Sequence, residues 1–160
     1  SIGGSRAYGA EDDASAACNF RCVNLHADTG DLAGTDPDVI LVYIGINDVG
    51  AVDESAEQFR KGYGEMISKL KARYDKADIF VIDLPYPDNT DAYPREKFDE
   101  CNAAIREIVA EAGLQLIRFS GSKADDGANL TCDRLHPNVY GMRAYYEVIR
   151  DALYDFYCKK

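Results

Sequence analysis

A histidine three residues after an aspartate is the first feature of this sequence that could do chemistry. The pair is Asp133 and His136, and it lies in the stretch CDRLHPNVYGM; His136 is one of only 2 histidines in 160 residues. In a loop, this offset lets the carboxylate fold back and accept a hydrogen bond from Nδ1–H of the imidazole, which leaves Nε2 free to take a proton from a nucleophile. A histidine near an aspartate is also commonly structural, so the pair alone leaves both interpretations open.

Two other stretches carry groups that could stabilise a developing negative charge. Asn47 lies in the stretch GIND, directly after an apolar run, and a side-chain amide there could donate to an oxyanion while staying neutral. Asn-Asp is equally common in turns. Near the start of the chain, Gly3 and Gly4 in the stretch SIGGSRAYG expose backbone N–H groups, although a glycine pair is also ordinary in flexible loops.

Three apolar runs that precede or flank these residues are predicted to be strands. They cover residues 39–44, 77–85 and 114–120, and the first is a continuous β-branched and aromatic run. Continuous runs of this kind are typical of parallel strands that are buried on both faces. The sequence therefore predicts a parallel sheet rather than an antiparallel one.

Three helices are predicted between and after the strands. The first starts at a capping box, Ser55 to Gln58, and the second covers residues 95–112 and ends at Gly113. The third begins after Pro137. The apolar positions of the first helix fall on one stripe: Phe59, Tyr63, Met66, Ile67, Leu70 and Tyr74. The third helix is expected to turn five residues inward: Met142, Tyr146, Ile149, Leu153 and Phe156.

The alternation of strands and helices predicts an α/β fold with a parallel sheet that helices cover on both faces. In open α/β sheets, ligands bind beyond the carboxyl ends of the strands. Asn47 follows the first strand and His136 follows the third, so we expect both to reach the same side of one sheet. Three strands make a thin sheet for this fold, and the residues before the first predicted strand contain no clear strand of their own.

Composition and charge exclude several classes of function. The chain is long enough for one domain, and its net charge of −10 argues against a nucleic-acid partner. No stretch is apolar enough for a membrane span, and no targeting segment that would assign a compartment is present. Five cysteines do not fit a disulfide scaffold. Cys18 and Cys22 could be joined to Cys132 and His136 as a metal site, but this is not a common zinc spacing.

Together these stretches resemble the SGNH hydrolases, also called GDSL esterases and lipases. SIGGSR is similar to the second motif block of that family, IGIND to the third and DRLHPNVYGM to the fifth. The resemblance implies a three-layer α/β/α, flavodoxin-like domain. It also implies that Gly4 N–H and the Asn47 amide form an oxyanion hole, and that Asp133 orients His136 as the general base of a Ser-His-Asp triad.

The sequence departs from that family at the nucleophile. The first block of the family is Gly-Asp-Ser, and this chain has no such block; Gly30 and Asp31 are followed by Leu32. The resemblance therefore implies one domain over residues 1–160 that is incomplete at its N-terminus, lacking its first strands and the catalytic serine. Ser5 is a weaker candidate as a replacement nucleophile. An open sheet edge would also favour a homodimer.

The leading hypothesis is a carboxylic ester hydrolase that needs no cofactor or metal and acts on a small-molecule acyl ester, an acetylated sugar or a lipid. The stretch over residues 83–98 could help to wall its acyl pocket, or be an ordinary surface loop. The alternative is a non-catalytic accessory module that binds a carbohydrate or acyl ligand. A nucleotide binder is disfavoured because no phosphate-cradling glycine loop follows a strand. The second histidine, His26, is expected on a helix surface.

Overall fold

The computed structural model describes residues 36–50 and 55–159, and its centre is a parallel sheet. The strands are β1 (Val39–Val42), β2 (Asp78–Ile82) and β3 (Gln115–Ile117), and they lie in the order β1-β2-β3. Val39 pairs with Asp78, and Phe80 pairs with Gln115. The predicted parallel α/β arrangement is confirmed, because each apolar run joins the sheet in the same direction.

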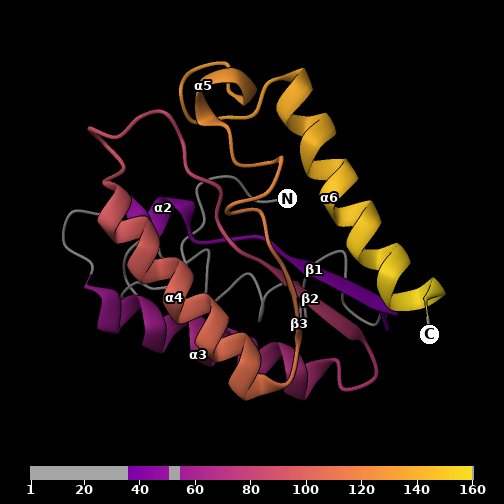
Figure 1. Ribbon diagram of the computed structural model, residues 1–160. Helices are drawn as coiled ribbons and strands as arrows, with labels where there is room; N and C mark the ends of the chain where they lie inside the picture. The colour runs from indigo at the N-terminus through magenta and orange to yellow at the C-terminus, as the bar shows by residue number, and fades with distance from the viewer. Residues whose placement is uncertain (1–35, 51–54, 160) are drawn as a thin grey trace.

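Helices cover both faces of this sheet (Figure 1). α3 (Ala56–Arg73) and α4 (Arg95–Ala112) pack side by side on one face, and α6 (Val139–Cys158) lies on the other. Two single-turn helices, α2 (Ile46–Val49) and α5 (Gly127–Leu130), lie in the connections after β1 and before α6. None of the helices in the described ranges is both long and apolar enough to cross a membrane.

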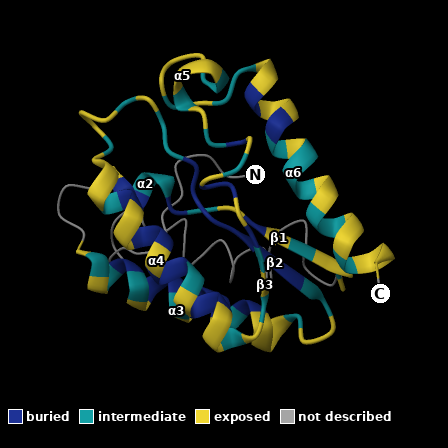
Figure 2. Ribbon diagram, viewed as in Figure 1, coloured by how far each residue is buried: buried dark blue, intermediate teal, exposed yellow. Residues whose placement is uncertain are grey.

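β2 is the strand that both layers bury. Ile79 and Val81 belong to the apolar core under α3 and α4, whereas Phe80 and Ile82 belong to the core under α6. Successive side chains of a strand point to opposite faces, so a strand between two helical layers must be apolar at every position. This explains the continuous apolar run in the sequence, and Figure 2 shows the buried residues of α3 and α4 on the sides that face the sheet.

The expectation that β1 is buried on both faces is wrong for the described part of the chain. Leu41 and Tyr43 are 44% and 43% exposed, while Val42 between them is buried. Leu41 pairs with Phe80 and therefore shares its face, the face that α6 covers. Within the described residues, α6 packs over β2 and β3 and leaves this face of β1 more open.

The start of α3 and the end of α4 form as the sequence predicts. Ser55 Oγ accepts a hydrogen bond from Gln58 N at 3.2 Å, and Ser55 N donates to Gln58 Oε1 at 2.9 Å, which completes the capping box. Gly113 ends α4 in the left-handed region with φ 65°. A residue without Cβ adopts this conformation at little cost, which is why glycine is favoured at this position.

α6 is turned about its axis relative to the prediction. Ile149, Leu153 and Phe156 pack inward as expected, but Met142 and Tyr146 are 58% and 61% exposed. Tyr145 takes the inward position that was predicted for Tyr146. The residues of α6 that pack on this core follow a regular helical spacing: Tyr145, Val148, Ile149, Ala152, Leu153 and Phe156. Tyrosine occurs at two adjacent positions, so composition alone could not tell which one faces the core.

Candidate active site

Asp133 and His136 contact each other, as the sequence predicts. His136 Nδ1 lies 2.7 Å from Asp133 Oδ2, and the two side chains are 70% and 54% exposed. Hydrogen bonds from His136 lower the pKa of Asp133 to about 2, so this carboxylate is ionised at neutral pH and can only accept. Nδ1 of a neutral imidazole must then carry the hydrogen, which leaves Nε2 as the acceptor. The catalytic role of the pair stays a prediction.

A tight turn brings the two side chains together. Asp133 Oδ1 accepts hydrogen bonds from Leu135 N at 3.1 Å and from His136 N at 2.6 Å. The turn passes through Arg134, the non-glycine residue of the described ranges with a positive φ, at 68°. A side chain in this left-handed region costs roughly 1–2 kcal/mol, so other contacts must hold the turn.

The start of α6 holds the segment on either side of His136. Asn138 caps the helix, because its Oδ1 accepts from Tyr140 N and Gly141 N at 2.9 and 3.0 Å. Its Nδ2 donates back to Asn129 O and Thr131 O. Cys132 N donates to His136 O at 2.9 Å, closing the loop on itself. The loop therefore holds His136 directly before the capped first turn of α6, a helix of 20 residues.

Asn47 lies at the carboxyl end of β1, in α2. Gly45 precedes this turn of helix with φ 126°, and a Cβ there would lie 3.3 Å from Leu84 Cδ1 and 3.4 Å from the Phe59 ring. Glycine is thus needed both for the backbone angle and for the packing. Asn47 is half-buried at this position. Its role as an oxyanion donor stays a prediction.

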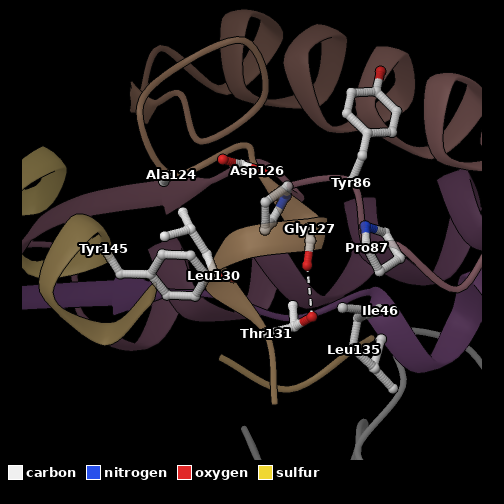
Figure 3. A pocket seen from close by; sticks show the side chains of 11 residues that line it. Ile46, Tyr86, Pro87, Ala124, Asp126, Gly127, Leu130, Thr131, Leu135 and Tyr145 are labelled. Atoms are coloured by element: carbon white, nitrogen blue, oxygen red, sulfur yellow. Dashed lines mark hydrogen bonds between the residues drawn. The ribbon is translucent and has the colours of Figure 1, made fainter. Parts of the chain in front are cut away.

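A small cleft is lined by one sequence neighbour of Asn47 and one of His136 (Figure 3). Ile46, which precedes Asn47, and Leu135, which precedes His136, both line it. The loop after β2 contributes Pro85, Tyr86 and Pro87. Three residues of the stretch 83–98, which could either help to wall an acyl pocket or be an ordinary surface loop, thus line this cleft; their role in an acyl pocket stays a prediction.

The remaining predicted residues at the amino end lie outside the described residues. These are Gly4, Ser5, His26, Cys18 and Cys22. Among the described residues, no group of three or more His, Cys, Asp or Glu side chains is arranged to hold a metal.

Each described serine already uses its hydroxyl in a structural contact. Ser120 is 4% exposed and its Oγ donates to Asp83 Oδ2 at 2.6 Å; Ser122 Oγ donates to Phe119 O. Ser55 caps α3, and Ser68 Oγ donates to Gly64 O. None of these hydroxyls contacts His136, so the described ranges present no nucleophile to it.

Sequence reasoning missed two residues, Asp83 and Arg134, that position this end of the sheet. Asp83 is fully buried at the end of β2, and Oδ1 accepts from Phe119 N and Ser120 N at 2.6 and 2.9 Å. Arg106 donates to its Oδ2 at 2.9 Å. An acidic residue within the apolar run of the strand predicted over residues 77–85 was a signal for Asp83. Arg134 had no such signal, because its partner, Asp88, lies far away in the sequence.

Three solved structures with similar folds are distant from this chain in sequence. The chain is 22% identical to the acetyl xylan esterase AlAXEase (TM-score 0.67, 94% of this chain and 77% of that one). It is 23% identical to LAE5, an alpha/beta hydrolase enzyme from the metagenome of Lake Arreo, Spain (TM-score 0.63, 81% and 66%). It is 19% identical to Axe2, an acetylxylan esterase from Geobacillus stearothermophilus (TM-score 0.61, 73% and 59%). These likenesses show a shared SGNH-hydrolase fold.

The chain thus spans less than two thirds of the length of LAE5 and of Axe2. Comparison with curated proteins finds no matching relative. A family model does match, over residues 4–144, and it describes the GDSL-like lipase/acylhydrolase family. This match covers most of the chain, including the stretches IGIND and DRLHPNVYGM and the part of SIGGSR from Gly4 onward, so the protein belongs to the GDSL-like lipase/acylhydrolase family.

Proposed function

We propose that this protein hydrolyses carboxylic esters by acyl transfer to a serine, with His136 as the general base. The contact between His136 Nδ1 and Asp133 Oδ2, at 2.7 Å, carries this proposal. It leaves Nε2 as the acceptor on a His136 side chain that is 70% exposed, and the preceding residue, Leu135, lines the cleft. Membership of an acylhydrolase family supports the same reaction.

The reaction would proceed in two halves. The serine Oγ attacks the acyl carbonyl carbon while His136 Nε2 takes its proton, and the Asn47 amide and Gly4 N–H donate to the oxyanion. Collapse of the tetrahedral intermediate expels the alcohol, which receives the proton from His136. Water then attacks the acyl-enzyme with the same base, releasing the acid and restoring the serine.

The proposal places the nucleophile on a serine outside the described ranges. The sequence contains no Gly-Asp-Ser stretch, and each described serine is engaged elsewhere. His136 can serve as base only for a hydroxyl within hydrogen-bond reach of Nε2. Identification of that serine is therefore part of the test.

Acetylated sugars are the first substrates to try. Two of the similar folds, AlAXEase and Axe2, carry the names of acetylxylan esterases. Small acyl esters and lipids are the other members of the proposed substrate class. Acetyl release from an acetylated xylo-oligosaccharide, compared with release of longer acyl chains, distinguishes among them.

The test compares the 2 histidines of the chain in the full-length protein. His136→Ala should lower kcat for p-nitrophenyl acetate by at least about 10³-fold, because the general base is lost. The matched variant His26→Ala should keep more than half of the activity. Equal losses in the two variants would contradict the assignment.

A serine-directed fluorophosphonate supplies the second measurement. The wild-type protein should be labelled, and mass spectrometry of the labelled peptide should name the nucleophile. If the wild-type protein shows neither labelling nor turnover, the esterase proposal fails. Binding of an acetylated oligosaccharide by such an inactive protein would instead support the accessory module.

A further inference from the structure

The turn that carries His136 is bound to the loop after β2 through both the backbone and the side chain of Arg134. Arg134 O accepts a hydrogen bond from Asn89 N at 3.1 Å. The guanidinium donates to Asp88 O at 2.8 Å and, through Nε, to Asp88 Oδ2 at 3.3 Å. Asp88 and Asn89, in the loop after β2, thus hold Arg134. Arg134 is the residue at which the turn before His136 passes through the left-handed region.

The loop after β2 is itself held firmly against α5. Tyr86 N donates to Asp125 Oδ1 at 2.7 Å. The backbone passes so close to Gly127 that a Cβ at that glycine would lie 2.4 Å from Asp88 N. Asp88 therefore offers a fixed point, to which the Arg134 fork can bind in a defined direction.

The contact between Arg134 and Asp88 is not explained by its contribution to the stability of the fold. The Arg134 and Asp88 side chains are 55% and 47% exposed, and ion pairs this open add little to the free energy of unfolding. Yet Arg134 lies between Asp133 and His136, and its φ of 68° is unfavourable for a residue with a side chain. A contact that holds an unfavourable turn in place controls the direction of the imidazole more than it stabilises the fold.

We propose that Asp88 and Arg134 are positioning residues that aim the His136 imidazole for proton transfer. This inference rests on the proposed hydrolase function, and neither residue touches the reacting atoms. The ion pair fixes the turn, the turn fixes the two backbone N–H groups that bind Asp133 Oδ1, and Asp133 fixes the tautomer of His136. Loss of the pair should then lower kcat and leave KM and the fold nearly unchanged.

The main test variant is Arg134→Gly in the full-length protein. Glycine adopts a φ of 68° without strain, so this change removes the tether and spares the backbone turn. We expect kcat for p-nitrophenyl acetate to fall on the order of 10-fold, because small misplacements of a base are costly, with KM within about twofold. Asp88→Asn should lower kcat in the same direction. Asp88→Asn keeps Arg134 and the backbone oxygen of residue 88 that accepts from it. This variant therefore tests the positioning role if Arg134→Gly does not fold.

Arg150→Ala is the matched control. Arg150 pairs with Asp151, the two side chains are 51% and 55% exposed, and neither lies in the predicted site. The thermal midpoint should change by a similar small amount in Arg134→Gly and Arg150→Ala, while kcat should fall only in the first. A wild-type kcat in both Arg134→Gly and Asp88→Asn would overturn the proposal.

A second readout keeps this inference separate from the proposed function. Long-range ¹H–¹⁵N spectra report which ring nitrogen of His136 carries the hydrogen, whether or not the protein is an esterase. The Nδ1–H form should dominate in the wild type and in Arg150→Ala, and should lose population in Arg134→Gly. If the wild type has no turnover, the proposed function fails and this spectrum alone decides. An unchanged tautomer would then overturn the positioning role.

Discussion

Asp133 binds both the backbone and the side chain of the residue that it orients. One carboxylate oxygen accepts from Leu135 N and His136 N, and the other contacts His136 Nδ1. An ionised carboxylate has no hydrogen to donate, so it accepts all three contacts at once. At this scale, the site depends on the charge of Asp133 as well as on its position.

Asp133→Asn should test the role of that charge. The asparagine oxygen can still accept from the two backbone N–H groups, but its amide nitrogen then faces Nδ1 and favours the wrong tautomer of His136. We expect kcat for p-nitrophenyl acetate to fall roughly 10⁴-fold. Asp151→Asn, a change at an exposed aspartate on α6, should leave kcat near the wild-type value. Similar kcat values in the two variants would contradict the triad.

The lowered pKa of Asp133 should also appear in stability. Its value falls from 3.8 to about 2 through the hydrogen bonds with His136, so the folded state favours the ionised form. The contribution is therefore fully present above pH ~4, and it is lost as pH falls through about 2. Urea unfolding of the wild type and Asp133→Asn between pH 2 and 6 should give a difference that shrinks toward the acid end. A difference that is the same at every pH would contradict this linkage.

At the scale of elements, the loop before α6 and the first turn of that helix form one packed unit. Asn138 N donates to Leu130 O at 2.8 Å, and Thr131 and Pro137 form an isolated bridge. A Cβ at Gly141 would lie 2.2 Å from Leu130 O. The loop thus closes over a position where only glycine fits, and the same closure fixes the path of the chain from His136 into α6.

Gly141→Ala should therefore damage this unit. We expect a loss of about 1–3 kcal/mol in the free energy of unfolding, because backbone must move to admit the methyl group. Gly64→Ala on α3 is the matched control, since a Cβ there meets only Ile108 Cδ1 at 4.0 Å. That variant should be neutral or more stable by about 0.5–1 kcal/mol. Urea unfolding of both variants measures the contrast, and equal effects would contradict the packing.

At the scale of the whole molecule, two apolar cores lie on opposite faces of the sheet, and Asp83 joins the strands between them. Its carboxylate is fully buried and accepts hydrogen bonds from Phe119 N, Ser120 N and Arg106. These groups come from the segment after β3 and from α4. Buried donors need a partner, so one side chain ties three parts of the fold together.

Asp83→Ala should destabilise the protein by about 3–5 kcal/mol, because it leaves buried N–H groups and a cation without their acceptor. Glu107→Ala provides the comparison, since Glu107 pairs with Arg60 at a site where both side chains are exposed. That loss should cost at most about 1 kcal/mol. Chemical denaturation of both variants gives the two values. A small effect at Asp83 would show that the segment after β3 is held by other contacts.

Local patterns in the sequence were enough to predict the parallel sheet, the capping box at Ser55 and the glycine end of α4. They were also enough for the contact between Asp133 and His136. The two helix ends and the contact between Asp133 and His136 each depend on residues a few positions apart, whose geometry is limited by the backbone, and the parallel sheet was predicted from apolar runs within single segments. The prediction of which residues of α6 face the core was partly wrong, because two adjacent tyrosines, Tyr145 and Tyr146, have the same chemistry and only packing distinguishes them.

Sequence by itself determined which residue types lie at the ends of the strands and which of them can fold back on a neighbour. Only the tertiary structure decided which distant segments meet. Ile46 and Leu135 line one cleft, Asp83 holds Ser120, and Arg134 binds Asp88 across 46 positions of chain. Such contacts depend on the register and direction of β1, β2 and β3, which bring the segments after the strands to one edge of the sheet. The spacing of nearby residues in the sequence does not predict these long-range contacts.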